Sequence, residues 1–260
     1  MNQIHSFSLT PHTYQPTTII FTSKDLLNNI KILQWNCRGI RGKLPFLQHI
    51  CQNLDILCLQ DTLLYPHSTF RINAFQSIRK DSEQPGQRGI CILIKNNLIF
   101  NHVDTSALQH PSVEIQGVSI DYSEDKEQLI ILNIYRHPNL HTPQIWFEDI
   151  SRLFTTAKKI LIVGDFNAHH TAWGGSKTDR VSRMLLNAMD NVQAYIVNDG
   201  KPTLLTAPGT NRSVIDITIA SADLAVACEV ITEEDTGDSD HFSVNISIGG
   251  SFSFRHVLYN

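Results

Sequence analysis

Short runs of apolar, β-branched residues recur along most of this sequence, and they constrain its fold more than any other feature. Runs of about four to eight such residues are typical of buried strands, whereas helices need longer amphipathic stretches. The predicted strands are 32–35, 56–59, 90–94, 113–120, 129–134, 160–163, 194–197, 213–220, 228–231 and 242–248. Helical spacing of apolar residues appears within 44–54, 145–154 and 181–188.

The order of these elements predicts an α/β domain with two packed β-sheets and helices on the outside. Strands occur both singly between helices and in uninterrupted series, which favours mixed sheets over a doubly wound parallel sheet. No linker divides residues 30–250, so we predict one domain there. Residues 1–29 contain Pro11 and Pro16 and lack periodicity, so we expect a poorly ordered extension, and we expect 251–260 to be a short tail.

The composition narrows the class of protein. Of 260 residues, 42% are hydrophobic and 18% are charged, which is typical of a globular domain and excludes disordered and fibrous chains. The net charge of −4 argues against coating nucleic acid by charge alone. The five cysteines include no Cys-x-x-Cys pair, so neither a disulfide framework nor a cysteine zinc site is indicated. No apolar run is long enough to predict a membrane span, so we expect no membrane partner.

Polar side chains stand repeatedly where predicted strands end. Asn36, Asp61 and Tyr135 each follow an apolar run, and Asp165 and Asn167 follow another. Strand ends that lead into loops are where a rigid scaffold presents catalytic groups. Since Asn and Asp are also common turn residues, a turn explains any one of these positions taken alone.

Two further positions are harder to explain as turns. Asp216 interrupts an alternating strand, 214–219, so its carboxylate points to the face opposite the isoleucines and requires a partner if buried. Asp240 stands directly before His241, at the start of the last apolar run. The acidic and amide side chains of both sets would form an oxygen-rich cluster with one imidazole. Such hard ligands favour Mg²⁺ or Mn²⁺ over zinc and indicate phosphoester hydrolysis.

The order of the motifs carries a family resemblance. They are Gln-Trp-Asn-Cys-Arg-Gly at 34–39, Leu-Gln-Asp-Thr at 59–62, Asn-Ile-Tyr-Arg-His-Pro at 133–138, Gly-Asp-Phe-Asn-Ala-His-His at 164–170, Trp-Gly at 173–174, Ile-Asp at 215–216 and Ser-Asp-His at 239–241. With these motifs the chain resembles the endonuclease/exonuclease/phosphatase superfamily, and within it the apurinic/apyrimidinic-like endonuclease domains of non-LTR retrotransposons. The resemblance implies a four-layer α/β sandwich with the site at one edge of the paired sheets.

The resemblance implies catalytic roles for five residues. Asp165 would position or deprotonate the attacking water, and Asn167 would orient that water or the phosphate. Tyr135 would touch the phosphate. Asp216 would pair with His241 and fix its tautomer, while His241 would contact the scissile phosphate.

The same resemblance implies that Asp61, Asn36 and Asp240 hold the metal ion. Asp61 stands where the family usually has glutamate, and its side chain is one methylene shorter. We therefore expect a shifted metal, a bridging water or a weaker affinity, which bears on activity and not on fold. For the substrate we predict contacts from Arg136, His169 and Arg212, although solvated surface charge is the ordinary explanation for each of the two arginines.

These features predict a Mg²⁺- or Mn²⁺-dependent DNA endonuclease that leaves a 3′-hydroxyl nick. One alternative is a weak or inactive relic of a retrotransposon, with its metal site compromised by Asp61. A second is a phosphatase for small phosphoesters. The residues after His241 are too few for a reverse transcriptase domain, so we expect that domain in a full-length element, and we expect this chain to be a monomer. A DNA substrate implies the nucleus, although no dense Lys/Arg cluster signals import, and otherwise we expect a cytoplasmic protein.

Overall fold

The computed structural model describes residues 30–83, 87–121, 128–157, 159–207, 209–210 and 212–249. The predicted extension at 1–29 and tail at 251–260 lie outside this part of the chain. The strands that are described form two six-stranded sheets, in the orders β11-β12-β1-β2-β4-β3 and β5-β6-β7-β8-β10-β9. Each sheet contains one parallel pair among antiparallel ones, so the prediction of two mixed sheets is confirmed.

The strands of the first sheet are β1 (Ile30–Asn36), β2 (Ile56–Gln60), β3 (Phe75–Lys80), β4 (Ile90–Lys95), β11 (Cys228–Thr232) and β12 (Val244–Ile248). Those of the second sheet are β5 (Phe100–His102), β6 (Val113–Asp121), β7 (Gln128–Arg136), β8 (Lys159–Asp165), β9 (Ala194–Ile196) and β10 (Asp216–Ser221). The α-helices are α1 (Leu44–Ile50), α2 (Gln144–Thr156), α3 (Arg180–Asp190) and α4 (Ala222–Ala225). Short 3-10 turns cover Arg41–Lys43, Cys51–Asn53, Ser106–Leu108 and Thr171–Trp173.

Two strands, β3 and β5, escape prediction from the sequence. Both are edge strands, and their residues are half-buried or exposed. An edge strand covers little core, so it needs no continuous apolar run. The pattern that reveals a buried strand is therefore absent from these two.

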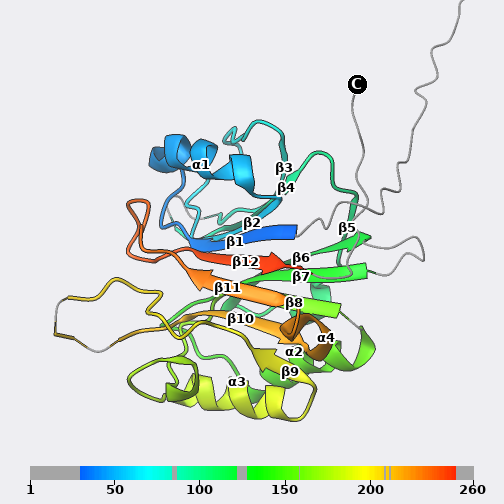
Figure 1. Ribbon diagram of the computed structural model, residues 1–260, viewed down its shortest axis with the longest axis vertical. Coiled ribbons are helices and arrows are strands. Elements are labelled where there is room, and N and C mark those ends of the chain that lie inside the picture. Colours follow the sequence, from blue (N-terminus) through cyan, green and yellow to red (C-terminus); the bar gives the residue numbers. More distant parts are fainter. Residues whose placement is uncertain are drawn as a thin grey trace, which may run out of the picture.

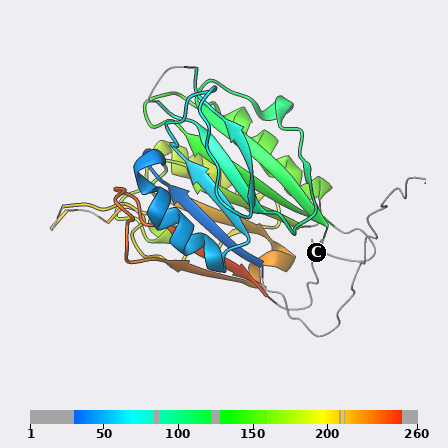
Figure 2. The same cartoon turned by 90° about the horizontal axis from the view of Figure 1, so that it is seen from above.

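The layers follow from which residues each element buries. Figure 1 shows α1 on the outer face of the first sheet and α2 and α3 on the outer face of the second. In the view from above, α1, in blue, lies in front of the sheets, and the green and yellow helices lie behind them (Figure 2). Apolar side chains of both sheets fill the middle layer, including Ile32, Ile92 and Leu161. Phe147 of α2 packs on the second sheet, and Leu47 of α1 packs on the first. This is the four-layer sandwich that the resemblance implies.

Strand pairing brings the polar strand ends to one edge of the sandwich. In the first sheet Asn36 pairs with Gln60, and in the second sheet Asp165 pairs with both Tyr135 and Asp216. Parallel neighbours end at the same side of a sheet, so their last residues are presented together. Gly164 makes this close packing possible, because a Cβ there would lie 1.8 Å from the carbonyl oxygen of Ile134 in β7.

Candidate active site

Three buried side chains form the centre of the site: Asp165 at the end of β8, Asp216 at the start of β10 and His241 in the loop before β12. The Nδ1 atom of His241 lies 2.8 Å from Oδ2 of Asp216. Its Nε2 atom lies 3.9 Å from Oδ2 of Asp165. The structure thus brings together three residues that are separated by up to 76 positions in the sequence, as His241 and Asp165 are.

The electrostatics of this centre favour a charged imidazole. Burial alone would lower the pKa of His241, but the charge and hydrogen bond of Asp216 and the charges of Asp165 and Asp240 raise it. Burial and the neighbouring charge of Asp216 raise the pKa of Asp165. A carboxyl group with a raised pKa is a better proton acceptor than an ordinary aspartate near neutral pH.

The side chain of Asn36 and the backbone of Asn167 hold Asp165 in place. Asn36 donates from Nδ2 to Oδ2 of Asp165, at 2.9 Å. The backbone N–H of Asn167 donates to Oδ1 of Asp165, also at 2.9 Å, and its side-chain amide donates to the carbonyl of Arg136. Asn167 adopts a left-handed backbone with φ of 46°, a conformation that asparagine tolerates better than most residues. Both oxygens of Asp165 therefore have fixed partners.

Asp61 and Asp240 form a second, less enclosed part of the site. Asp240 pairs with the guanidinium of Arg38 through Oδ2, while its Oδ1 atom is buried without a hydrogen-bond partner among the described residues. Burial raises the pKa of Asp61, against the lowering effects of the Arg38 charge and a backbone hydrogen bond from Arg88. An unpaired buried carboxylate oxygen beside a second carboxylate is a fitting environment for a divalent cation.

The side chains of Tyr135 and Arg136 lie on either side of the end of β7. Burial and the charges of Asp61, Asp165 and Glu114 raise the pKa of Tyr135, so its phenol stays protonated at neutral pH. Arg136 is buried and donates from Nη1 to the carbonyl of His137. Its contact with substrate remains a prediction.

His169 and Arg212 lie at the rim. The Nδ1 atom of His169 is 3.2 Å from Oγ of Ser213, and its backbone N–H donates to Asp179. Arg212 is exposed and donates to the carbonyl of Gly200 at 3.3 Å. Their contacts with substrate also remain predictions.

A polar network that was not predicted from the sequence lies beneath the site. Gln34 donates to Oδ1 of Asp216 at 2.9 Å and to Gln60 at 2.7 Å, and Gln60 donates to Asn133 at 2.6 Å. These three side chains are fully buried between the sheets. A signal for them exists, because each is a lone amide in or at the end of an otherwise apolar run. Their hydrogen bonds fix Asp216 and connect the two sheets.

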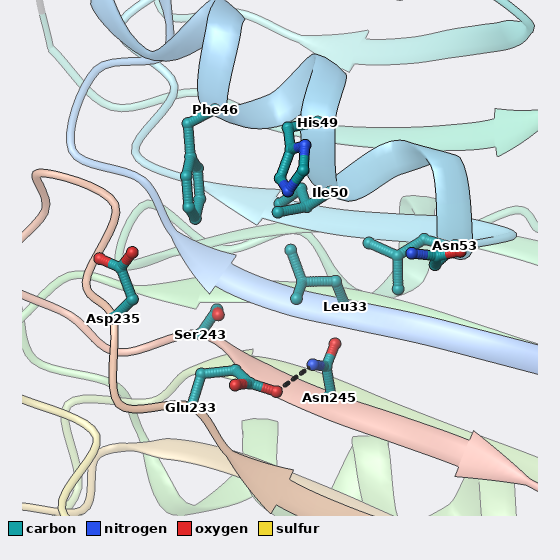
Figure 3. Close-up of a pocket in the computed structure, with 10 residues that line it drawn as sticks. Leu33, Phe46, His49, Ile50, Asn53, Glu233, Asp235, Ser243 and Asn245 are labelled. Atoms are coloured by element: carbon teal, nitrogen blue, oxygen red, sulfur yellow. Dashed lines mark hydrogen bonds between the residues drawn. The ribbon is translucent and has the colours of Figure 1, made fainter.

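A separate groove lies between α1 and the strands β1 and β12, with a volume of about 360 Å³. Figure 3 shows Phe46 and Ile50 of α1 facing Leu33 of β1, with Glu233 and Asn245 hydrogen-bonded across the floor. No predicted site residue lines this groove. It is therefore distinct from the polar cluster at the sheet edge.

Known proteins with similar sequences include those of retrotransposons. The family described as "Endonuclease-reverse transcriptase" matches residues 129–245. The probable RNA-directed DNA polymerase from transposon BS of Drosophila melanogaster is 25% identical over 228 residues, which are 85% of this chain and 24% of that protein. The corresponding protein of transposon X-element is 26% identical over 178 residues, 67% of this chain and 19% of that protein. The chain thus spans a quarter or less of these relatives.

Solved structures share the fold at lower identity. The endonuclease domain of TRAS1, a telomere-specific non-LTR retrotransposon, has a TM-score of 0.68 at 19% identity and covers 85% of this chain and 98% of its own. AP endonuclease LMAP from Leishmania major has a TM-score of 0.71 at 14% identity, covering 90% and 93%. The 3′ phosphatase NExo from Neisseria has a TM-score of 0.67 at 16% identity, covering 85% and 100%.

The paired sheets and the helices that cover them have the endonuclease/exonuclease/phosphatase fold. The resemblance to the endonuclease domains of non-LTR retrotransposons is confirmed. No helix in the described part of the chain is both long and apolar enough to cross a membrane.

Proposed function

We propose that this chain is a divalent-metal-dependent DNA endonuclease that hydrolyses one phosphodiester and leaves a 3′-hydroxyl. The observation that carries the proposal is the arrangement of Asp165 and His241. Oδ2 of Asp165 lies 3.9 Å from Nε2 of His241. Asn36 holds Asp165 by a hydrogen bond, and Asp216 holds His241. At this distance the two atoms do not hydrogen-bond directly, so each is free to act on a reacting group beside it, Asp165 as a proton acceptor and His241 as a hydrogen-bond donor.

In the proposed hydrolysis, residues of this chain act on the attacking water and on the phosphate. Asp165 accepts a proton from the water as the water oxygen attacks phosphorus. His241, held by Asp216, offers Nε2–H to a non-bridging oxygen and stabilises the negative charge that develops there. The protonated phenol of Tyr135 donates to the same phosphate. The bond from phosphorus to O3′ breaks, and O3′ takes up a proton to become the 3′-hydroxyl.

Asp61, Asp240 and Asn36 would hold Mg²⁺ or Mn²⁺, and the unpaired Oδ1 atom of Asp240 supports this assignment. When bound, the ion would polarise the phosphoryl group and stabilise the leaving oxygen. The ligand atoms of Asp165, Asp216 and His241 also lie close enough together to hold a metal ion. We assign them to proton transfer instead, because their atoms already pair with one another and with Asn36.

The partners follow from the same proposal. The substrate is DNA, which places the protein in the nucleus, and the nuclease acts as a monomer. A reverse transcriptase domain belongs to the full-length element, since both curated relatives are described as RNA-directed DNA polymerases and are about four to five times longer than the matched region. Primer extension from the released 3′-hydroxyl would connect the two activities.

A plasmid assay tests the proposal. Supercoiled DNA is incubated with the protein and Mg²⁺ or Mn²⁺, with EDTA as the metal-free arm, and nicked circles are quantified. We expect metal-dependent nicks that a DNA polymerase extends without phosphatase treatment. Asp165→Asn should reduce nicking about a thousandfold, whereas Asp190→Asn, an exposed aspartate at the end of α3, should not. Equal nicking by wild type and Asp165→Asn would refute the proposal.

A further inference from the structure

Glu114, the second residue of β6, belongs to none of the groups described above, yet its carboxylate contacts both sheets. Its Oε2 atom accepts the backbone N–H of Gly89, directly before β4 in the first sheet, at 2.9 Å. Its Oε1 atom lies 3.5 Å from Nε2 of His137, directly after β7 in the second sheet. The Glu114 side chain is only 14% exposed, so water competes little for these contacts.

The contact with Gly89 leads to Asp61. Thr62 donates its N–H to the carbonyl of Gly89 at 3.0 Å, and the backbone N–H of Arg88 reaches the Asp61 carboxylate. The Arg88–Gly89 turn is thus held between Glu114 on one side and the segment of Asp61 on the other. A shift of this turn would move the hydrogen-bond donor of Asp61.

The backbone of this turn and of the Asp61 segment is left-handed. The φ angle is 51° at Asp61, 59° at Arg88 and 95° at Gly89. Such conformations are unfavourable for residues other than glycine and persist only where the surroundings hold them. A Cβ at Gly89 would meet Oγ1 of Thr62 at 2.8 Å, so the turn is also closely packed. Glu114 supplies a side-chain hydrogen bond that holds it.

The contact with His137 leads to Tyr135. The rings of Tyr135 and His137 meet edge to face, with centroids 4.9 Å apart. Burial and the charges of Arg88 and Arg136 lower the pKa of His137 to about 4, so the ring is neutral at neutral pH. The contact between His137 and Glu114 is therefore a polar contact of a neutral ring and not an ion pair.

We propose that Glu114 is a positioning residue that sets the place of Asp61 relative to Tyr135. Asp61 follows a strand of the first sheet and Tyr135 lies on a strand of the second, and apolar packing between sheets is not directional. Hydrogen-bonded side chains that reach from one sheet to the other supply the direction that packing lacks. The buried amide network does so beneath Asp216, and Glu114 does so between the segments of Asp61 and Tyr135. This inference rests on the proposed function, because it assigns Asp61 to the metal and Tyr135 to the phosphate.

Comparing Glu114→Ala with Glu114→Gln tests the proposal. Alanine removes both contacts, whereas glutamine keeps an oxygen for the Gly89 N–H and offers an N–H to neutral His137. We expect Glu114→Ala to weaken Mn²⁺ binding about tenfold, measured by electron paramagnetic resonance, and to raise KM for plasmid DNA by a similar factor. Glu114→Gln should stay within about threefold of wild type in both. Glu229→Gln, an exposed glutamate on β11, is the matched control and should change neither.

His137→Ala separates the two contacts. It removes the ring that packs on Tyr135 but leaves the Gly89 contact, so KM should rise about fivefold while Mn²⁺ affinity stays at the wild-type value. If Glu114→Ala does not unfold cooperatively on heating as the wild type does, His137→Ala tests the proposal in its place. A fall in Mn²⁺ affinity in folded His137→Ala would then overturn the proposal.

Two outcomes for folded Glu114 variants would overturn the proposal. Equal impairment of Glu114→Gln and Glu114→Ala would mean that the charge matters and not the hydrogen bonds. Wild-type Mn²⁺ affinity and KM for Glu114→Ala would mean that the two contacts do not position Asp61 or Tyr135. Mn²⁺ binding is measured without DNA, so a lack of nicking by the wild type would count against the proposed function and leave the effect of Glu114 on Mn²⁺ affinity open to measurement.

Discussion

The two parts of the candidate active site are built differently. Asp165, Asp216 and His241 are buried and hydrogen-bonded to one another or to neighbouring amides, so folding alone completes their arrangement. Asp61 and Asp240 are partly exposed. One oxygen of Asp240 has no hydrogen-bond partner in the described part of the chain, and the other pairs with Arg38, whose side chain is 62% exposed. The comparison indicates that the part we assign to acid–base chemistry is preorganised by the fold, whereas the part we assign to the metal would be completed by a cation.

The largest effect is expected from Asp216→Asn, which changes the preorganised part without changing its shape. Asparagine cannot supply the charge that raises the pKa of His241, and it places an N–H where the imidazole needs an acceptor. Nicking should fall about a thousandfold or more, as in hydrolases that lose the aspartate behind a catalytic histidine. Asp223→Asn, an exposed aspartate on α4, is the matched control.

The same variant gives a spectroscopic prediction. In EDTA, the imidazole of His241 should titrate at lower pH in Asp216→Asn than in wild type, as followed by proton NMR. The sign follows from linkage. The pKa of His241 is raised in the folded protein, so its contribution to stability is present below the unfolded pKa and is lost as pH rises through the folded value. An unchanged His241 titration would show that Asp216 does not control the imidazole.

A smaller effect is expected from Asp61→Glu, which alters only the metal part. The added methylene gives the side chain the length of the glutamate that the resembled endonucleases usually have at this place, so its carboxylate would reach further toward a metal ion. The Mg²⁺ concentration for half-maximal nicking should fall about tenfold, while kcat at saturating metal changes less than threefold. A large rise in kcat would instead support the alternative of a weakened relic. Loss of Mn²⁺ binding would refute the assignment of Asp61 as a ligand.

The difference between the two parts also explains which features could be predicted from the sequence. Buried strands and the acids at their ends could be predicted, because burial imposes apolar runs and catalytic groups interrupt them at fixed places. Glu114 could not be assigned, since its role depends on a turn in the other sheet that no local pattern reveals. Gln34 and Gln60 were visible as single amides, but only strand pairing shows that they support Asp216.

Arg38→Gln should change Mn²⁺ affinity less than the other variants change theirs or their activity. It tests whether Arg38 competes with the cation for the carboxylates of Asp61 and Asp240. The guanidinium of Arg38 pairs with Asp240 and its charge also acts on Asp61, so it occupies the electrostatic position that a divalent cation needs. An exposed ion pair contributes only about 0 to 1 kcal/mol to stability, so the variant should fold normally. Mn²⁺ affinity should rise about threefold, and the His241 titration in EDTA should remain at its wild-type position. Weaker Mn²⁺ binding would mean that Arg38 organises the carboxylates and does not compete for them, and the metal part would then be as preorganised as the acid–base part.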